Sequence, residues 1–244
     1  FVLAYNMLPV FPVKMSDGSW YENVGYDLGN PVHNIEANTR ENKTNSYYGV
    51  GDLQFTIIDG LDIKASLYKS RRLNEYSQYY DSTTDAGRDD GGYAYKRSQT
   101  YDKDMMEWTL NYDKTFNDVH KVNGLLGYSW EENMFSEFTA ANRNFTTDML
   151  GANKLQAGQD LRPDDVTSQK NEYRLISMFA RAHYSYAERY MITATVRRDG
   201  SSKFGTNHKW GIFPSVSAAW GISQEAFMQD IDWINDLKLR AGWG

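Results

Sequence analysis

Apolar and polar side chains alternate along three neighbouring segments in the last third of the chain. In the first segment the apolar positions are Ile176, Met178, Ala180, Ala182, Tyr184 and Tyr186, and most of the residues between them are polar. The same alternation runs from Tyr190 to Val196 and, after a polar loop at residues 199–205, from Val216 to Ile222. A period of two predicts β-strands with one apolar and one polar face.

The pattern recurs earlier in the chain and predicts further strands. Residues 47–58 and 61–68 alternate on either side of Asp59-Gly60, a dipeptide typical of tight hairpins. Further alternating runs cover residues 106–113 and 122–130, and a last strand begins near residue 237. Eight strands are therefore expected from Tyr47 onwards. Residues 1–45, rich in Pro, Gly and Asp, are expected to form a long loop or a short hairpin around Asp17-Gly18.

The connections alternate between short and long. Short ones are expected at residues 59–60, 117–120, 187–189 and 223–236, and long ones near 70–104, 133–173 and 199–211. Outer-membrane barrels show this rhythm, with short turns in the periplasm and long loops outside the cell. The fold class predicted is all-β, an antiparallel transmembrane β-barrel. Aromatic residues near the strand ends are the candidates for its membrane interfaces: Trp108, Tyr112, Tyr128, Trp130, Tyr184, Tyr186, Tyr190 and Trp220.

Composition narrows the class of protein. Apolar residues make up 41% of the chain. The mean hydropathy is −0.68, and no window approaches the roughly 20 apolar residues of a spanning helix. The chain has no cysteine, which excludes disulfides and thiolate metal sites, and its net charge of −6 argues against nucleic acid as a partner. Aromatic residues are abundant at 15%, including 18 tyrosines.

Several blocks of the chain resemble a signature of the SusC/RagA family. The blocks are Tyr184-Ser185-Tyr186, residues 193–205, Phe213-Pro214-Ser215-Val216-Ser217 with Trp220, and residues 236–241. The resemblance implies that residues 1–244 are an internal piece, roughly eight strands, of one large barrel of about 22 strands. The family's plug domain and TonB-contacting segment would then lie outside this piece.

The resemblance also implies a function. SusC/RagA proteins are TonB-dependent transporters of the bacterial outer membrane, found in Bacteroidetes, and they import oligosaccharides or peptides under a SusD-like surface lipoprotein. Expected partners are thus that lipoprotein, TonB, outer-membrane lipid and the substrate. The alternative is a small self-contained outer-membrane barrel with a structural or adhesive role, since eight strands can close on themselves.

The residues themselves predict little covalent chemistry. No catalytic constellation, metal site or cofactor site is expected. His183 and Ser185 share one face of a predicted strand and would be the basis of a hydrolase, but polar residues lining a wet interior are the favoured interpretation. Aromatic residues in the long segment at 70–104 are the candidates for contacts with substrate or lipoprotein: Tyr76, Tyr79, Tyr80, Tyr93 and Tyr95. Packing within a folded loop is the favoured alternative for them.

Overall fold

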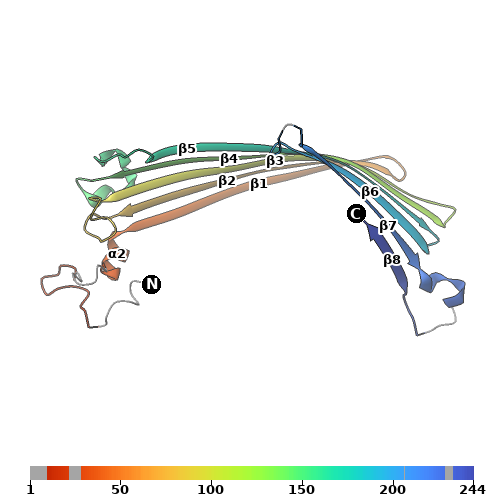
Figure 1. Ribbon diagram of the computed structural model, residues 1–244, viewed down its shortest axis with the longest axis horizontal. Helices are drawn as coiled ribbons and strands as arrows, with labels where there is room; N and C mark the ends of the chain where they lie inside the picture. Colours follow the sequence, from red (N-terminus) through yellow and green to blue (C-terminus); the bar gives the residue numbers. More distant parts are fainter. Residues whose placement is uncertain (1–9, 22–28, 206, 229–232) are drawn as a thin grey trace. The chain divides into compact units, whose positions relative to one another are not determined.

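The computed structural model describes residues 10–21, 29–205, 207–228 and 233–244. They form one eight-stranded antiparallel sheet in which the strands lie side by side in chain order (Figure 1). The strands are β1 (Thr39–Ile58), β2 (Leu61–Tyr80), β3 (Tyr93–Phe116), β4 (His120–Arg143), β5 (Val166–Tyr186), β6 (Tyr190–Ser201), β7 (Trp210–Gly221) and β8 (Lys238–Trp243).

Helical segments are few and short. They are α2 (Pro31–Ala37), η1 (Asp148–Asn153), η2 (Leu155–Ala157), η3 (Ile222–Gln224) and η4 (Ala226–Met228). In the described residues no helix is long and apolar enough to cross a membrane. The sheet confirms the prediction of an all-β antiparallel fold with eight strands. The alternative of a self-contained eight-stranded barrel is not supported, because β1 and β8 are the two edges of the described sheet and do not pair with each other.

The strands extend further than the alternation predicted. The long connections are residues 81–92, 144–165 and 202–209, so the expected bounds of 70–104, 133–173 and 199–211 were too wide. The reason lies in the outer parts of the strands, which carry polar side chains on both faces, as in Lys69-Ser70-Arg71-Arg72. A strand without an apolar face gives no period-two signal and cannot be told from a loop by pattern alone.

The segment expected as loop or hairpin contains both a hairpin and a helix. An isolated antiparallel β-bridge joins the backbones of Lys14 and Trp20, and Gly18 in the turn between them has a φ of +86°. Asn30 then caps α2, since its side-chain oxygen accepts hydrogen bonds from the Val32 and His33 amides. β1 begins at Thr39, inside the expected loop.

The sheet divides into two compact units, each described by itself. The loop unit comprises Phe1–Tyr47, Arg71–Tyr101 and Phe135–Asn171. The belt unit comprises Tyr48–Ser70, Asp102–Met134 and Glu172–Gly244.

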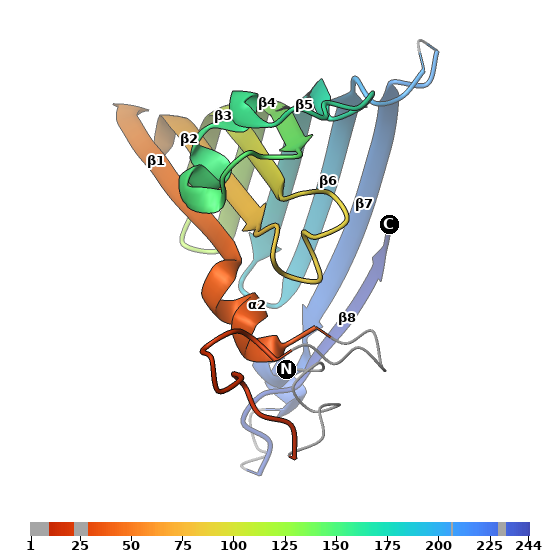
Figure 2. The ribbon, with the colours of Figure 1, turned by 90° about the vertical axis from the view of Figure 1, so that its left-hand side faces the viewer.

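In the belt unit β5, β6 and β7 lie side by side (Figure 2), and their register with one another and with β8 places apolar residues in transverse rows on one face. One row contains Tyr186, Tyr190, Trp220 and Leu239, and another contains Ala182, Ala194, Val216 and Trp243. Most of these large side chains are exposed: Trp243 by 67%, Leu239 by 60% and Tyr190 by 48%. In water such a face would be an aggregation surface, whereas in lipid it is the solvated one.

The loop unit has a small core of its own. Tyr79, Ala94, Phe145 and Ala152 form one buried cluster, and Leu155 and Ala157 pack against it. The segment 144–158 therefore folds back onto one face of β2 and β3 and covers it.

Candidate functional site

The alternation of side chains divides the five candidate tyrosines between the two faces of β2 and β3. Tyr79 lies on the covered face, where it is 2% exposed and its ring meets Phe145 edge-on at 5.5 Å. Its hydroxyl donates a hydrogen bond of 2.7 Å to Asp148 Oδ1. Tyr79 is thus a core residue of a folded loop, and a contact with substrate or lipoprotein is not open to it.

The other four tyrosines share the opposite face. Tyr80 stacks on Tyr93 with ring centres 6.0 Å apart, and Tyr76 meets Tyr95 edge-on at 5.9 Å. Tyr101 and Phe135, which were not predicted as candidates, form a third pair of rings on this surface. We call the six side chains the aromatic wall: Tyr76, Tyr80, Tyr93, Tyr95, Tyr101 and Phe135.

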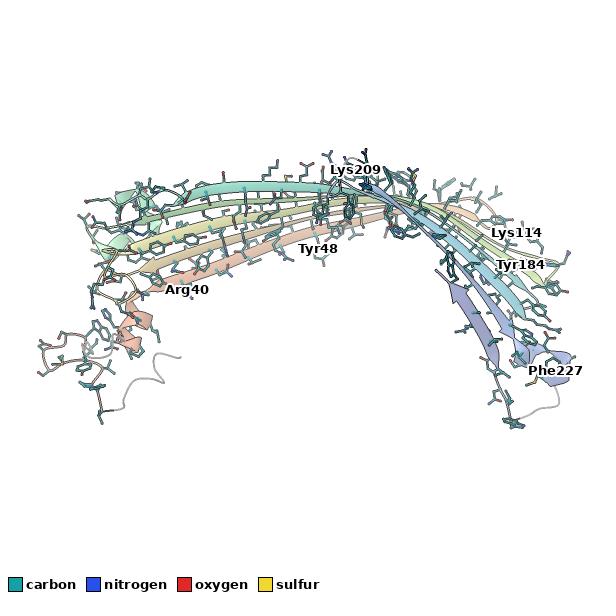
Figure 3. The ribbon with its side chains drawn as sticks, viewed as in Figure 1. Arg40, Tyr48, Lys114, Tyr184, Lys209 and Phe227 are labelled. Carbon is teal, nitrogen blue, oxygen red and sulfur yellow. The ribbon has the colours of Figure 1, made fainter. Side chains whose placement is uncertain are left out.

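Three arginines lie against the aromatic wall. The Arg40 guanidinium donates to the Tyr80 hydroxyl at 3.1 Å, and Figure 3 shows Arg40 near the start of β1 beside α2. Arg97 lies 5.4 Å from the centre of the Tyr76 ring. Arg143 lies 4.9 Å from the centre of the Tyr93 ring. Cation–π contacts of this kind hold a guanidinium against an aromatic face while leaving its N–H groups free to donate.

The arginines differ in their charge partners. Arg143 Nη1 lies 2.8 Å and 2.7 Å from the two oxygens of Asp165, and its Nε lies 3.4 Å from Asp90. Arg143 is therefore neutralised within the protein. In the described part of the chain neither Arg40 nor Arg97 forms an ion pair, and Arg97 Nε is buried without a hydrogen-bond partner.

A row of amides and a carboxylate crosses the same face beside the aromatic wall. Glu137 accepts hydrogen bonds from Gln99 Nε2 at 2.5 Å and from Gln169 Nε2 at 2.8 Å. Thr139 and Thr167 share a bond of 2.6 Å between their hydroxyls. The face thus combines flat rings, free guanidinium donors and polar groups that can both donate and accept.

The two long loops are joined on the covered side by Asp148. Its carboxylate accepts from the Ser82 amide at 2.9 Å and the Ser82 hydroxyl at 2.7 Å, besides Tyr79. Burial alone would raise the pKa of the Asp148 carboxyl, but these bonds together outweigh burial and hold the pKa below its usual value. Asp148 therefore stays charged and ties the loop after β2 to the loop after β4.

A second set of ion pairs joins the same loops. Arg162 Nη2 lies 2.9 Å from Asp90 and 2.7 Å from Asp160. In the residues described no cluster of three or more acidic, His or Cys side chains is arranged to hold a metal ion. Asp90 pairs with Arg143 at the end of β4 and with Arg162 in the loop that follows.

On the polar face of the belt unit, His183 is hydrogen-bonded to a threonine of the neighbouring strand. His183 Nδ1 lies 2.8 Å from Thr193 Oγ1 on β6. Thr193 is its direct partner in the β5–β6 register, so the imidazole is hydrogen-bonded across the sheet. This arrangement fits the favoured interpretation of a polar lining.

The candidate interface aromatics occupy the belt unit. Tyr190 Oη and Trp220 Nε1 both donate to Glu225 Oε1, at 2.6 Å and 3.0 Å, so one carboxylate positions two rings of the same row. Tyr184 lies near the turn end of β5 and its hydroxyl is 2.7 Å from His120 Nδ1 (Figure 3). The remaining candidates lie on β3 (Trp108 and Tyr112), on β4 (Tyr128 and Trp130) and in the β5–β6 hairpin (Tyr186). Their role at a membrane stays a prediction.

One further aromatic residue, Trp210, begins β7 at the end opposite Trp220 and was not predicted as part of a strand. Trp210 stacks under the Arg198 guanidinium at 4.6 Å and lies in the row of Ile176 and Gly200. The signal was present, since Trp210 precedes Ile212 by two positions and so shares its face. A Trp beside an Arg that can reach the headgroups is typical of a membrane interface.

Together these features define a class of structure, the wall of an outer-membrane β-barrel. A strand needs about 9–11 residues to cross a bilayer, and β3 and β4 have 24 each. The chain belongs to the family described as "TonB dependent receptor-like, beta-barrel", whose profile matches residues 7–244. Proteins of this family are outer-membrane β-barrels, and they are transporters or receptors, not enzymes.

Individual relatives agree with this assignment. The TonB-dependent receptor P39 of Formosa agariphila is 34% identical over 234 residues, covering 93% of this chain and 22% of the relative. The TonB-dependent receptor SusC of Bacteroides thetaiotaomicron is 42% identical over 89 residues, covering 36% of this chain and 9% of SusC. The resemblance to SusC/RagA transporters is thereby confirmed.

Solved structures show the same fold. A chain of the RagAB peptide importer in its "closed-closed" state superposes with a TM-score of 0.78 at 23% identity, covering 93% of this chain and 26% of the other. The RagAB peptide transporter gives a TM-score of 0.74 over the same share of both chains. The chain thus spans about a quarter of the length of the relatives that it matches.

Proposed function

We propose that the protein containing this chain imports oligosaccharides or peptides across the outer membrane, driven by TonB and working with a SusD-like surface lipoprotein. The observation that carries the proposal is the family match over residues 7–244. Similarity to SusC and to an importer of the RagAB type supports it.

In this proposal the chain forms roughly a third of the barrel wall, and the apolar rows of the belt unit face lipid. The segment from Tyr190 to Arg198 comprises nine residues, so the interval between the row of Tyr190 and the pair of Arg198 and Trp210 matches the length of a spanning strand. The polar face, with His183 and Thr193, then faces the lumen. The short turns lie in the periplasm and the three long connections lie outside the cell.

In this proposal the aromatic wall is the surface of the loop unit that meets the substrate. Its rings and the arginines beside them lie together on one face of β2 and β3, where flat rings can stack on a ligand at low entropic cost.

Uptake in the natural host tests the function. Deletion of the gene for the full-length protein should abolish growth on one oligosaccharide or peptide source, and deletion of tonB should abolish the same growth. The protein purified from outer membranes should be about four times as long as this chain and carry a lipoprotein partner. Growth that survives loss of TonB, or a full-length protein isolated without a lipoprotein, would contradict the proposal.

A further inference from the structure

The centre of the aromatic wall contains polar groups that the protein leaves without partners. In the described part of the chain, Arg97 Nε and Asn74 Oδ1 are both buried and have no hydrogen-bond partner. Asn74 lies two residues before Tyr76 on the same face of β2, and the Arg97 guanidinium lies against the Tyr76 ring. The same face of the sheet thus carries a buried donor and a buried acceptor that have no hydrogen-bond partner within the protein, and such groups are rare in native structures.

The chemistry of these groups selects a ligand. A guanidinium without an acidic partner is suited to a carboxylate, which it can bind through two parallel hydrogen bonds. A hydroxyl group can accept a hydrogen bond from Arg97, and it can equally donate one to Asn74. A ligand carrying both carboxylate and hydroxyl groups would satisfy all of them.

The shape of the face favours sugar rings over a peptide chain. The Tyr80 and Tyr93 rings, whose planes differ by 27°, can stack on the apolar faces of sugars, and the row of Gln99, Glu137 and Gln169 offers donors and acceptors to hydroxyls. A peptide recognised through its backbone would need a free strand edge. β2, β3 and β4 are each paired on both sides, so their backbone groups are already used.

We propose that the aromatic wall binds an acidic oligosaccharide, with Arg97 holding a carboxylate of a uronic acid while Tyr80 and Tyr93 stack on neighbouring sugar rings. Arg40, which also has no ion-pair partner in the described residues, supplies a second positive charge on the same wall. This inference rests on the proposed import function and specifies its substrate class.

The test is a binding titration with the full-length protein purified with its natural partners. The probes are tetramers of galacturonate, mannuronate and guluronate, their methyl esters as neutral counterparts, and tetraglutamate as an acidic peptide. We expect at least one uronate tetramer to bind tenfold or more tightly than its ester. Arg97→Gln should weaken this binding by about ten- to a hundredfold, the usual range for one charge-assisted hydrogen-bonded contact, and should remove the preference over the ester.

Two variants control the experiment. Lys96→Gln removes the same charge from the adjacent residue, whose side chain lies on the opposite face of β3, and should leave binding unchanged. Arg97→Lys keeps the charge but loses the planar pair of donors, and an intermediate affinity is expected.

Three results would overturn the inference. They are equal binding of uronates and their esters, equal loss in the Lys96 and Arg97 variants, and a preference for tetraglutamate that depends on Arg97. Each of them would leave the proposed import intact, because growth that depends on TonB is measured separately. Failure of the growth test would instead remove the import function.

Discussion

The loop unit buries apolar side chains in a small core, whereas the belt unit exposes them on one face. Every buried apolar residue of the described part lies in the loop unit: Tyr79, Ala94, Ala141, Phe145 and Ala152. The belt unit instead exposes large apolar side chains in ordered rows. A strand pair surrounded by water must build a core from its own loops, whereas a strand pair surrounded by lipid needs none. The burial or exposure of apolar side chains therefore distinguishes strands suited to water from strands suited to lipid.

Removal of the central ring of the loop unit should have the largest effect on this contrast. Tyr79→Ala deletes a buried aromatic side chain and its bond to Asp148, and we expect a loss of about 3–5 kcal/mol in the local free energy of unfolding. Hydrogen exchange in residues 81–92 and 144–165 should accelerate while the belt unit keeps its protection. Tyr76→Ala, on the uncovered face, is the matched control, and equal acceleration in both variants would refute the asymmetry of the two faces.

A charge on the apolar face of the belt unit should have the next largest effect. Ala194 lies midway between Tyr190 and Arg198, and Ala194→Arg should cost about 2–4 kcal/mol of folding free energy in a bilayer, as expected for arginine at the midplane. Urea titration of the full-length protein in phospholipid vesicles measures this cost. Thr195→Arg, one residue along and on the polar face, should cost much less. A reversed order would mean that the lipid and lumen faces are assigned wrongly.

Loss of the Asp148 carboxylate should have a smaller, pH-dependent effect. Asp148→Ala leaves the Tyr79 hydroxyl and the Ser82 amide without their acceptor. It should lower the local free energy of unfolding by about 1–3 kcal/mol. Because the pKa of Asp148 is lowered in the folded protein, its contribution is complete above the usual value of 3.8 and is lost as the pH falls through the folded pKa. Peptic cleavage of residues 144–165 should therefore rise at acid pH in the natural protein. In Asp148→Asn that rise should be weaker, and an unchanged pH profile would exclude Asp148 as the cause.

The exposed ion pairs should matter least. The Arg162 side chain is 48% exposed, so Arg162→Gln should change loop protection only slightly, and less at high salt. Arg143→Gln is the informative contrast. The Arg143 and Asp165 side chains are 14% and 9% exposed, and loss of the cation leaves a carboxylate that is nearly buried. Hydrogen exchange at residues 160–165 distinguishes the two variants, and equal effects would show that burial does not set the strength of these pairs.

How well each strand could be predicted depended on what surrounds its two faces. The strands around Ala180, Ala194 and Ala218 were predicted because lipid on one side and polar groups on the other impose a strict alternation. The outer parts of β2 to β5 were assigned to loops, because both faces there carry polar side chains. α2 was missed as well, since its seven residues include Pro31 and only a brief apolar pattern.

The candidate tyrosines show the same limit at the level of a site. Their abundance in the outer segment was visible in the sequence, and their alternation along β2 was available once the strand was known to continue through it. Which face the segment 144–158 would cover was not visible, because that depends on contacts between residues about 70 positions apart, such as Tyr79 and Asp148. Trp210 was missed for a local reason, since it begins its strand beside a polar loop.

The amino-acid sequence alone determined the class of fold, the number of strands and the family, because a periodic pattern and a motif such as residues 193–205 are local properties of the chain. Tertiary structure alone decided that Tyr79 is a core residue while Tyr76, Tyr80, Tyr93 and Tyr95 form an open wall with arginines beside them. The physical reason is that burial and charge pairing depend on which segments meet in space, and residues 144–158 pack against the face that carries Tyr79 and Ala94.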